Sequence, residues 1–153
     1  MASGAFVFPD RARLNLFSAT NLIGANPANF AMSLHAATWT PVNSTDEVFA
    51  DATGELATGF GYTAGGLALT GVTLGQTAGV VKFTCAAAVW TATGGSLPAW
   101  RRGVVYYRGT LNGRVNPIVG HFLGDSTPAD VPATTSGNTL TVTPSANGIL
   151  GAA

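Results

Sequence analysis

The chain has little charge. Only 9% of its 153 residues are Asp, Glu, Lys or Arg, whereas a typical soluble domain has about 25%. Seven basic and seven acidic residues cancel, so the formal net charge at pH 7 is zero. Because a monomer with so little charge tends to associate or precipitate, we expect much of the surface to be covered by other subunits. The alternative is a neutral domain kept soluble by Ser, Thr and Asn.

Basic runs, paired cysteines and long apolar runs are also scarce. Without a basic patch, the sequence does not favour nucleic acid as a partner. The longest apolar run, CAAAVW, begins at Cys85 and is far shorter than the ~20 residues that span a bilayer, so no membrane association is expected.

The single cysteine cannot form an internal disulfide and is expected to be a small buried hydrophobe. No basic stretch precedes an apolar one at the N-terminus, so no signal peptide is predicted and synthesis in the cytoplasm is expected.

Patterns typical of catalytic or metal sites are not found in the sequence. His35 and His121, the only histidines, each lie in an apolar alternating run. Together with one cysteine they do not supply the ligand spacing of a zinc site, which predicts core or interface histidines. The acidic cluster does not match a calcium loop, and a solvated loop is expected there. Its members are Asp46, Glu47, Asp51 and Glu55. We therefore expect no enzyme activity, no metal and no cofactor.

Residues 54–74 contain six glycines and a single charge. The glycine spacing is not G-x-G-x-x-G, and no Lys-Ser or Lys-Thr follows, so phosphate binding is not indicated. We interpret the first part as a connection in which glycines supply positive φ, with Phe60 and Tyr62 as anchoring side chains. In the strand that follows, Leu67 and Leu69 are expected on one face.

Two-residue alternation recurs from residue 29 onward and predicts an all-β chain. The segments that show it are NFAMSLHAATW, LALTGVTL, GVVKFTCAA, RGVVYYRG, NPIVGHFLG, NTLTVTP and NGILGAA. In the first of them, the pattern is that of a half-buried strand. Asn112-Gly113 lies between the fourth and fifth segments and is the strongest hairpin signal in the chain. Seven or eight short strands with regular turn signals predict an antiparallel β-sandwich, jelly-roll-like, over residues 29–153.

The N-terminal residues 1–28 are expected to form an arm and one short helix. Pro9 followed by Asp10 is typical of a helix start, which predicts a helix over about residues 9–18. Gly24 would end the helix, because glycine favours the position after the last helical turn.

The arm itself, residues 1 to about 13, is apolar at its start and belongs to no alternating strand. Such a terminus is normally loose, and adjacent exposed apolar side chains are a liability. We therefore expect it to lie across a neighbouring subunit, with Phe6 and Phe8 as anchors and Arg11 and Arg13 meeting acidic groups. In the competing interpretation, the two phenylalanines fold back into their own core.

The stretch PAWRRGVVYYRG has the composition of a protein–protein contact. It contains Trp100, Arg101, Arg102 and Tyr107, residue types enriched at interface hot spots. Arg is preferred over Lys where planar contacts are made across an interface. The alternative is a strand with aromatic core residues and exposed arginines at its edge, and the two interpretations are compatible.

Four longer stretches carry a resemblance. They are MSLHAATWTP, EVFADATGELATGFGYTAGGLALTGVTL, AAAVWTATGGSLPAWRRGVVYYRG and NPIVGHFLGD. In this order the chain resembles a family of small phage virion proteins encoded among head and tail genes. The likeness covers most of residues 30–150 and consists of turn and core residues. At His121 the family pattern has an acid before the Phe, so a contact shared at that position is in doubt.

The resemblance implies a non-enzymatic structural protein of the virion. The first hypothesis is a capsid cement (decoration) protein on the outside of a phage head. It would be a homo-oligomer (dimer or trimer) that bridges subunits of the major capsid protein. The alternative is a tail-associated or host-adsorption protein built on the same sandwich. A third reading, from another class, is a small hydrolase or lectin-like sugar binder.

Overall fold

The computed structural model describes residues 6–7, 9, 27–77, 80–127, 129–145 and 150–152. Apart from Pro9, the helix expected over residues 9–18 lies outside these residues. The described part consists of antiparallel strands, with two short 3-10 turns at Pro27–Asn29 and Phe49–Asp51, which confirms the all-β prediction there. No helix in it has the length and apolar character needed to cross a bilayer.

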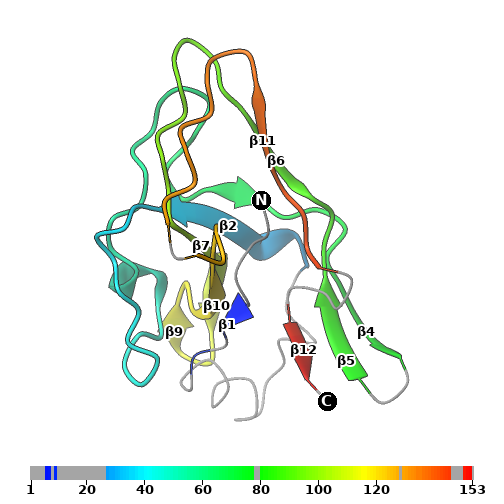
Figure 1. Ribbon diagram of the computed structural model, residues 1–153. Coiled ribbons are helices and arrows are strands. Elements are labelled where there is room, and N and C mark those ends of the chain that lie inside the picture. The colour runs from blue at the N-terminus through cyan, green and yellow to red at the C-terminus, as the bar shows by residue number, and fades with distance from the viewer. Residues whose placement is uncertain are drawn as a thin grey trace.

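The largest sheet has five strands in the order β1-β10-β7-β2-β3, and all neighbours are antiparallel. Its strands are β1 (Phe6–Val7), β10 (Ile118–Leu123), β7 (Arg102–Tyr107), β2 (Phe30–His35) and β3 (Leu67–Ala68). The longest three lie side by side at its centre (Figure 1). This sheet therefore joins segments that lie far apart in the sequence, from Phe6 to Leu123.

Smaller sheets complete the fold. A two-stranded sheet pairs β6 (Ala88–Thr91) with β11 (Thr139–Val142), and a three-stranded sheet has the order β12-β5-β4. The latter is made of β12 (Leu150–Ala152), β5 (Val80–Thr84) and β4 (Thr73–Thr77). The hairpin strands are β8 (Thr110–Leu111) and β9 (Arg114–Val115). In Figure 1, β6 and β11 run together from the upper loops toward β5 and β12.

The two faces of the five-stranded sheet are covered differently. One face points into the main apolar core, which includes Phe30, Met32, Leu34, Val105, Tyr107 and Phe122 together with Trp90 of β6. The other face carries Ser33, His35, Val104 and His121, and a smaller cluster around Trp39 and Phe49 packs on this side. Every residue of β2 is therefore buried, and the expectation of a half-buried strand is wrong because a loop covers its polar face.

The predicted hairpin at Asn112-Gly113 is confirmed. Thr110 pairs with Val115 and Leu111 with Arg114, which leaves a two-residue loop. Asn112 has φ 51° and Gly113 has φ 75°, the positive values that a type I′ turn requires at both central positions.

One local expectation is wrong. Phe6 and Val7 do belong to a strand, because β1 pairs with β10 in the register Phe6↔Phe122. The pairing agrees with the expectation that Leu67 and Leu69 share a face, since Leu67 lies opposite Met32 and the Leu69 N–H donates to the carbonyl of Phe30, 2.8 Å away. Their burial differs: Leu67 is exposed and Leu69 is buried.

Candidate functional site

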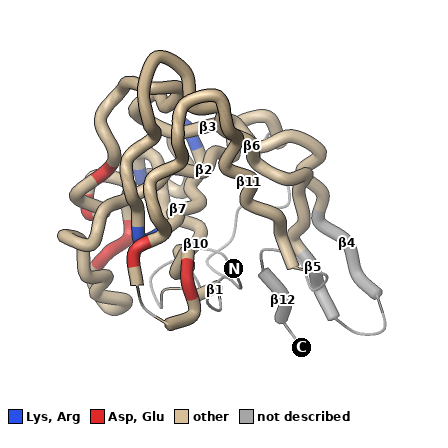
Figure 2. Tube along the Cα trace, turned by 45° about the horizontal axis from the view of Figure 1, so that its top comes forward, with Lys and Arg blue, Asp and Glu red and all other residues tan. Residues whose placement is uncertain are grey.

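Charge is unevenly distributed over the fold. Residues 56–77, 83–100 and 131–145 contain no Asp, Glu, Lys or Arg, and we call them the uncharged region. Ten of the fourteen acidic and basic residues instead occupy 46–55 and 101–130, the charge-bearing region. In Figure 2 the red and blue segments gather on the side of β7 and β10, while β6 and β11 are tan throughout.

The outer face of the β6–β11 sheet is made of Thr and Val. Val89 lies opposite Thr141, and Thr91 lies opposite Thr139. All four side chains are exposed, and Val89 has 45% of its surface accessible. The uncharged region therefore presents a strand surface whose side chains are short, stiff and neutral.

Three loops of the uncharged region meet beyond the end of this sheet, and we call residues 58–62, 93–96 and 135–138 the apical loops. The Gly137 N–H donates to the Ala92 carbonyl at 2.8 Å, and the Thr93 N–H donates to the Phe60 carbonyl at 3.4 Å. Phe60, expected to anchor its loop, lies against Gly95 with one half of its ring and leaves the other half exposed. The apex therefore displays an aromatic ring.

Tyr62, in contrast, is the anchor that the sequence indicated. Its side chain is buried, and its hydroxyl donates to Glu55 Oε1 at 2.7 Å while accepting the Leu34 N–H at 3.1 Å. The same carboxylate oxygen accepts the Gly65 N–H at 2.6 Å. Burial, with the nearby Glu55 carboxylate, raises the pKa of Tyr62 well above its usual range. The phenol therefore remains a neutral donor that ties the glycine-rich segment to β2.

Arg108 holds the same segment from the other side. Its Nη2 donates to the carbonyls of Gly65 and Gly66 at 2.7 and 2.9 Å. The Tyr106 hydroxyl also donates to the Gly65 carbonyl, at 2.7 Å. A charged side chain is thus used to fix backbone rather than to bind something outside the chain.

The acidic residues do not form one solvated cluster. Asp51 Oδ2 accepts the N–H groups of Glu47 and Val48, each at 2.9 Å, and Asp46 accepts the Val42 N–H at 2.9 Å. A carboxylate oxygen of Glu47 lies 2.9 Å from Nε of Arg114. Among the described residues, no three His, Cys, Asp or Glu side chains lie close enough together to hold a metal ion. Each acid instead shapes its own loop.

Both histidines are buried on the polar face of the five-stranded sheet, as expected for core residues. His35 Nδ1 lies 2.9 Å from the Thr53 carbonyl, and Nε2 lies 2.9 Å from the Ser33 hydroxyl. A carbonyl can only accept, so Nδ1 carries the proton and the neutral ring is fully hydrogen-bonded. Burial lowers the pKa of His35, although the Thr53 carbonyl opposes the shift.

His121 is a less satisfied group. Its Nε2 lies 3.1 Å from Asn43 Oδ1, and Nδ1 is buried without a partner among the described residues. The ring packs edge-on to Trp39 at 5.5 Å. Burial, and secondarily the positive charge of Arg102, lower the pKa of His121 to about 4. The surroundings of His121 therefore favour the neutral imidazole over the charged form.

The predicted contact residues are placed in different environments. Trp100 and Tyr107 are buried in the main core, so their rings stabilise the chain itself and do not form a surface for another subunit. Arg101 is partly exposed and its Nε lies 2.7 Å from Asp130 Oδ1. Arg102 is half-buried, and burial lowers its pKa, with Arg101 adding repulsion. Of these four predicted contact residues, only the two arginines have side chains that are partly exposed.

The predicted arm residues are less completely described. The Phe6 ring stacks on Phe122 with centroids 6.4 Å apart and packs against the main core, as the competing interpretation expected. Phe8, Arg11 and Arg13 lie outside the described residues. Cys85, expected to be buried, is half-buried against the same core, and burial raises its thiol pKa to about 11.

Sequence reasoning missed the apical loops as a group. No signal in the sequence predicts that residues 58–62, 93–96 and 135–138 lie together, because the pairing of β6 with β11 is what makes them neighbours.

Comparisons of the chain with protein-family models, with curated proteins and with solved structures found no match.

Proposed function

We propose that the chain is a non-enzymatic structural protein of a phage virion, a capsid cement protein that binds the outside of the head and bridges major capsid subunits. In this proposal the strands form a jelly-roll-like β-sandwich, and the protein acts as a dimer or trimer. One observation supports it most: the uncharged region exposes Phe60, Leu67 and Val89 and contains no charged residue, while the charge-bearing region uses several of its charges within the chain.

The physical argument concerns what such a surface can do. Phe60, Leu67 and Val89 are exposed in the uncharged region, and their burial against a partner carries no cost of desolvating charge. Apolar burial contributes roughly 25 cal/mol per Å². In a shell with many copies, contacts that are weak singly act together through multivalency. A neutral β-surface therefore suits repetitive assembly better than capture of a charged ligand.

The resemblance described above supports the same proposal through its turn and core residues, and the comparisons add nothing to it. A second function, host adsorption by a tail-associated protein, is favoured by one observation. The apical loops display a half-exposed Phe60 beside Gly95 at the end of the molecule, where loops of a sandwich commonly bind partners. The two functions differ in where the protein is located on the particle.

The test is to locate the protein in purified particles of the phage that encodes it. We expect peptide mass spectrometry to find it in virions, and gold-labelled antibody against it to decorate heads in electron micrographs. Labelling confined to tails would favour the adsorption protein. Absence from the particle would contradict both functions.

A further inference from the structure

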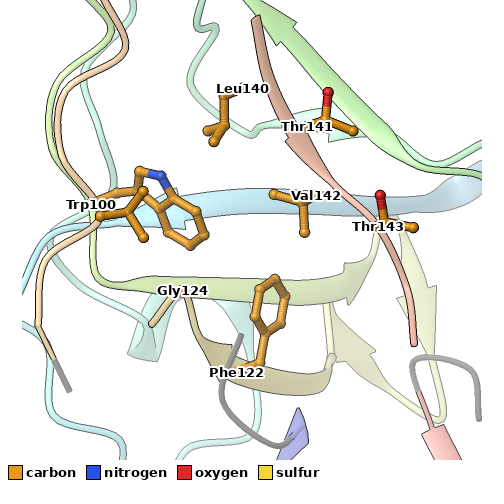
Figure 3. A pocket seen from close by; sticks show the side chains of 8 residues that line it. Trp100, Phe122, Gly124, Leu140, Thr141, Val142 and Thr143 are labelled. Atoms are coloured by element: carbon orange, nitrogen blue, oxygen red, sulfur yellow. The ribbon is translucent and has the colours of Figure 1, made fainter. Parts of the chain in front are cut away.

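A pocket of about 300 Å³ opens beside β11. Figure 3 shows Phe122 on one side of it and Leu140 and Val142 on the other, with Trp100 at one end. Gly124, Val131, Thr141 and Thr143 complete the lining. No charged residue takes part. Such a volume lies at the lower end of small-molecule sites and exceeds the roughly 150 Å³ that holds benzene in an apolar protein cavity.

One polar atom in this lining has no partner. The Trp100 side chain is 3% exposed, and its Nε1 is buried with no hydrogen bond to any described residue. In Figure 3 this nitrogen lies on the edge of the indole that faces Leu140 across the pocket. Buried tryptophans usually find an acceptor for this N–H, and a buried donor left unsatisfied is costly. The pocket therefore offers one unused donor among uncharged residues.

The indole is held firmly in this position. The Trp100 backbone exchanges hydrogen bonds with Val131, at 3.2 and 2.7 Å. The ring packs edge-on to Phe122, with centroids 6.4 Å apart, and lies over Gly124, where a Cβ atom would approach it to 2.7 Å. A donor fixed before binding loses little entropy when an acceptor arrives.

We propose that this pocket binds a small, uncharged, mainly apolar molecule that carries one hydrogen-bond acceptor, which the Trp100 indole N–H engages. The lining contains no charged residue, so nothing in it would neutralise the charge of an ion. The volume admits a molecule with a single ring and a short substituent. This inference is independent of the proposed virion function.

The experiment compares two probes of nearly equal shape. Acetophenone has a carbonyl acceptor, and α-methylstyrene has a methylene group in the same place. Both are titrated into the ¹⁵N-labelled chain while the three indole N–H resonances are followed by NMR. We expect acetophenone to shift the Trp100 signal and to bind roughly three- to tenfold more tightly than α-methylstyrene, the factor that one net hydrogen bond supplies.

Three variants locate the effect. Trp100→Phe keeps a ring but removes the donor, and should abolish the difference between the probes. Val142→Phe fills the pocket and should weaken the binding of both probes. Val89→Phe, on the outer face of the same sheet, should leave the binding of both probes unchanged. The signals of Trp39 and Trp90 report whether each variant is folded. Even if a variant fails to fold, equal affinity of the two probes for the wild-type chain overturns the proposal, as does an unshifted Trp100 resonance up to the solubility limit of acetophenone.

Discussion

The charge-bearing and uncharged regions of this molecule hold their loops by different means. In the first, carboxylates and guanidinium groups bind backbone directly, as Asp51 does for the N–H groups of Glu47 and Val48. In the second, loops meet through backbone hydrogen bonds, as between Gly137 and Ala92, and through close glycine contacts, as between Gly61 and Thr91. Several charges in the described part of the chain thus support its own loops, and residues 56–77, 83–100 and 131–145 carry none.

The two regions join at one place. Glu55 and Arg108 both hold the segment that contains Gly65, the first through its N–H and the second through its carbonyl. The rest of the glycine-rich segment can therefore remain uncharged, because Glu55 at its start and Arg108 outside it fix the backbone at Gly65. In this molecule, an uncharged surface segment is thus held by charged side chains that bind its backbone.

The largest loss of stability is expected from a substitution at Gly61, in the uncharged region. Its φ is 91°, and a Cβ atom there would collide with the Thr91 carbonyl of β6. Gly61→Ala should lower the free energy of unfolding by about 3–5 kcal/mol, since backbone strain and overpacking add. Chemical denaturation measures this.

Gly94→Ala is the matched control. Gly94 also has positive φ, 71°, but nothing lies within 4 Å of a Cβ atom at that position. Only the conformational cost remains, about 1–2 kcal/mol. Equal losses in the two variants would show that the apical loops are not packed as described.

The next effect concerns the charge-bearing region and pH. His121 has a folded pKa of about 4 against an ordinary 6.5, so between these values the unfolded chain binds more protons than the folded one. Stability should therefore fall as pH decreases from about 6.5 to 4, by up to about 2–3 kcal/mol from this residue. His35 contributes in the same direction.

The control removes the titrating ring and keeps an aromatic of similar size. In His121→Phe, the free energy of unfolding should depend less on pH across this window than in the wild type, with Asn43 left to solvent. If denaturation curves of the two proteins have the same pH dependence, His121 does not carry the effect.

The smallest effect is expected at the β8–β9 hairpin. Gly113 has φ 75° with open space around it, so Gly113→Val introduces only strain, about 1–2 kcal/mol. Gly113→Asn should cost less, because Asn tolerates positive φ. A melting temperature unchanged by the Val substitution would be evidence against the type I′ turn.

Strands with strong alternation could be predicted from the sequence, and isolated or covered ones could not. β7 and β10 contain β-branched and aromatic residues and are joined by Asn112-Gly113, so both strands and hairpin were predicted. β1 has two residues, and only its partner β10 makes it a strand. β2 was expected to expose its polar face, because the sequence does not reveal that Trp39 returns to cover it.

The candidate site follows the same rule. Tyr62 could be predicted as an anchor, since a tyrosine among glycines has few other roles. For Trp100 the sequence leaves a surface contact and a core position both open, because residue type alone cannot separate a hot spot from a core ring. The apical loops and the pocket depend on pairing between residues about fifty apart, as for Trp90 and Leu140, and local pattern carries no information about such pairs.

The central claim is that the uncharged region is a surface covered by another subunit. Val89 and Val115 form a matched pair for testing it. They are exposed valines on strands, 45% and 64% accessible, but Val89 lies in the uncharged region and Val115 in the charge-bearing region. Replacing either with Lys adds one charge to its surface at similar cost to the fold.

Sedimentation velocity over a concentration series measures the outcome. We expect the wild-type chain to sediment as a dimer or trimer, Val89→Lys to shift toward monomer by at least tenfold in dissociation constant, which corresponds to about 1.4 kcal/mol, and Val115→Lys to behave as wild type. A wild-type chain that is monomeric throughout the series, or an assembly disrupted by Val115→Lys and not by Val89→Lys, would contradict the claim.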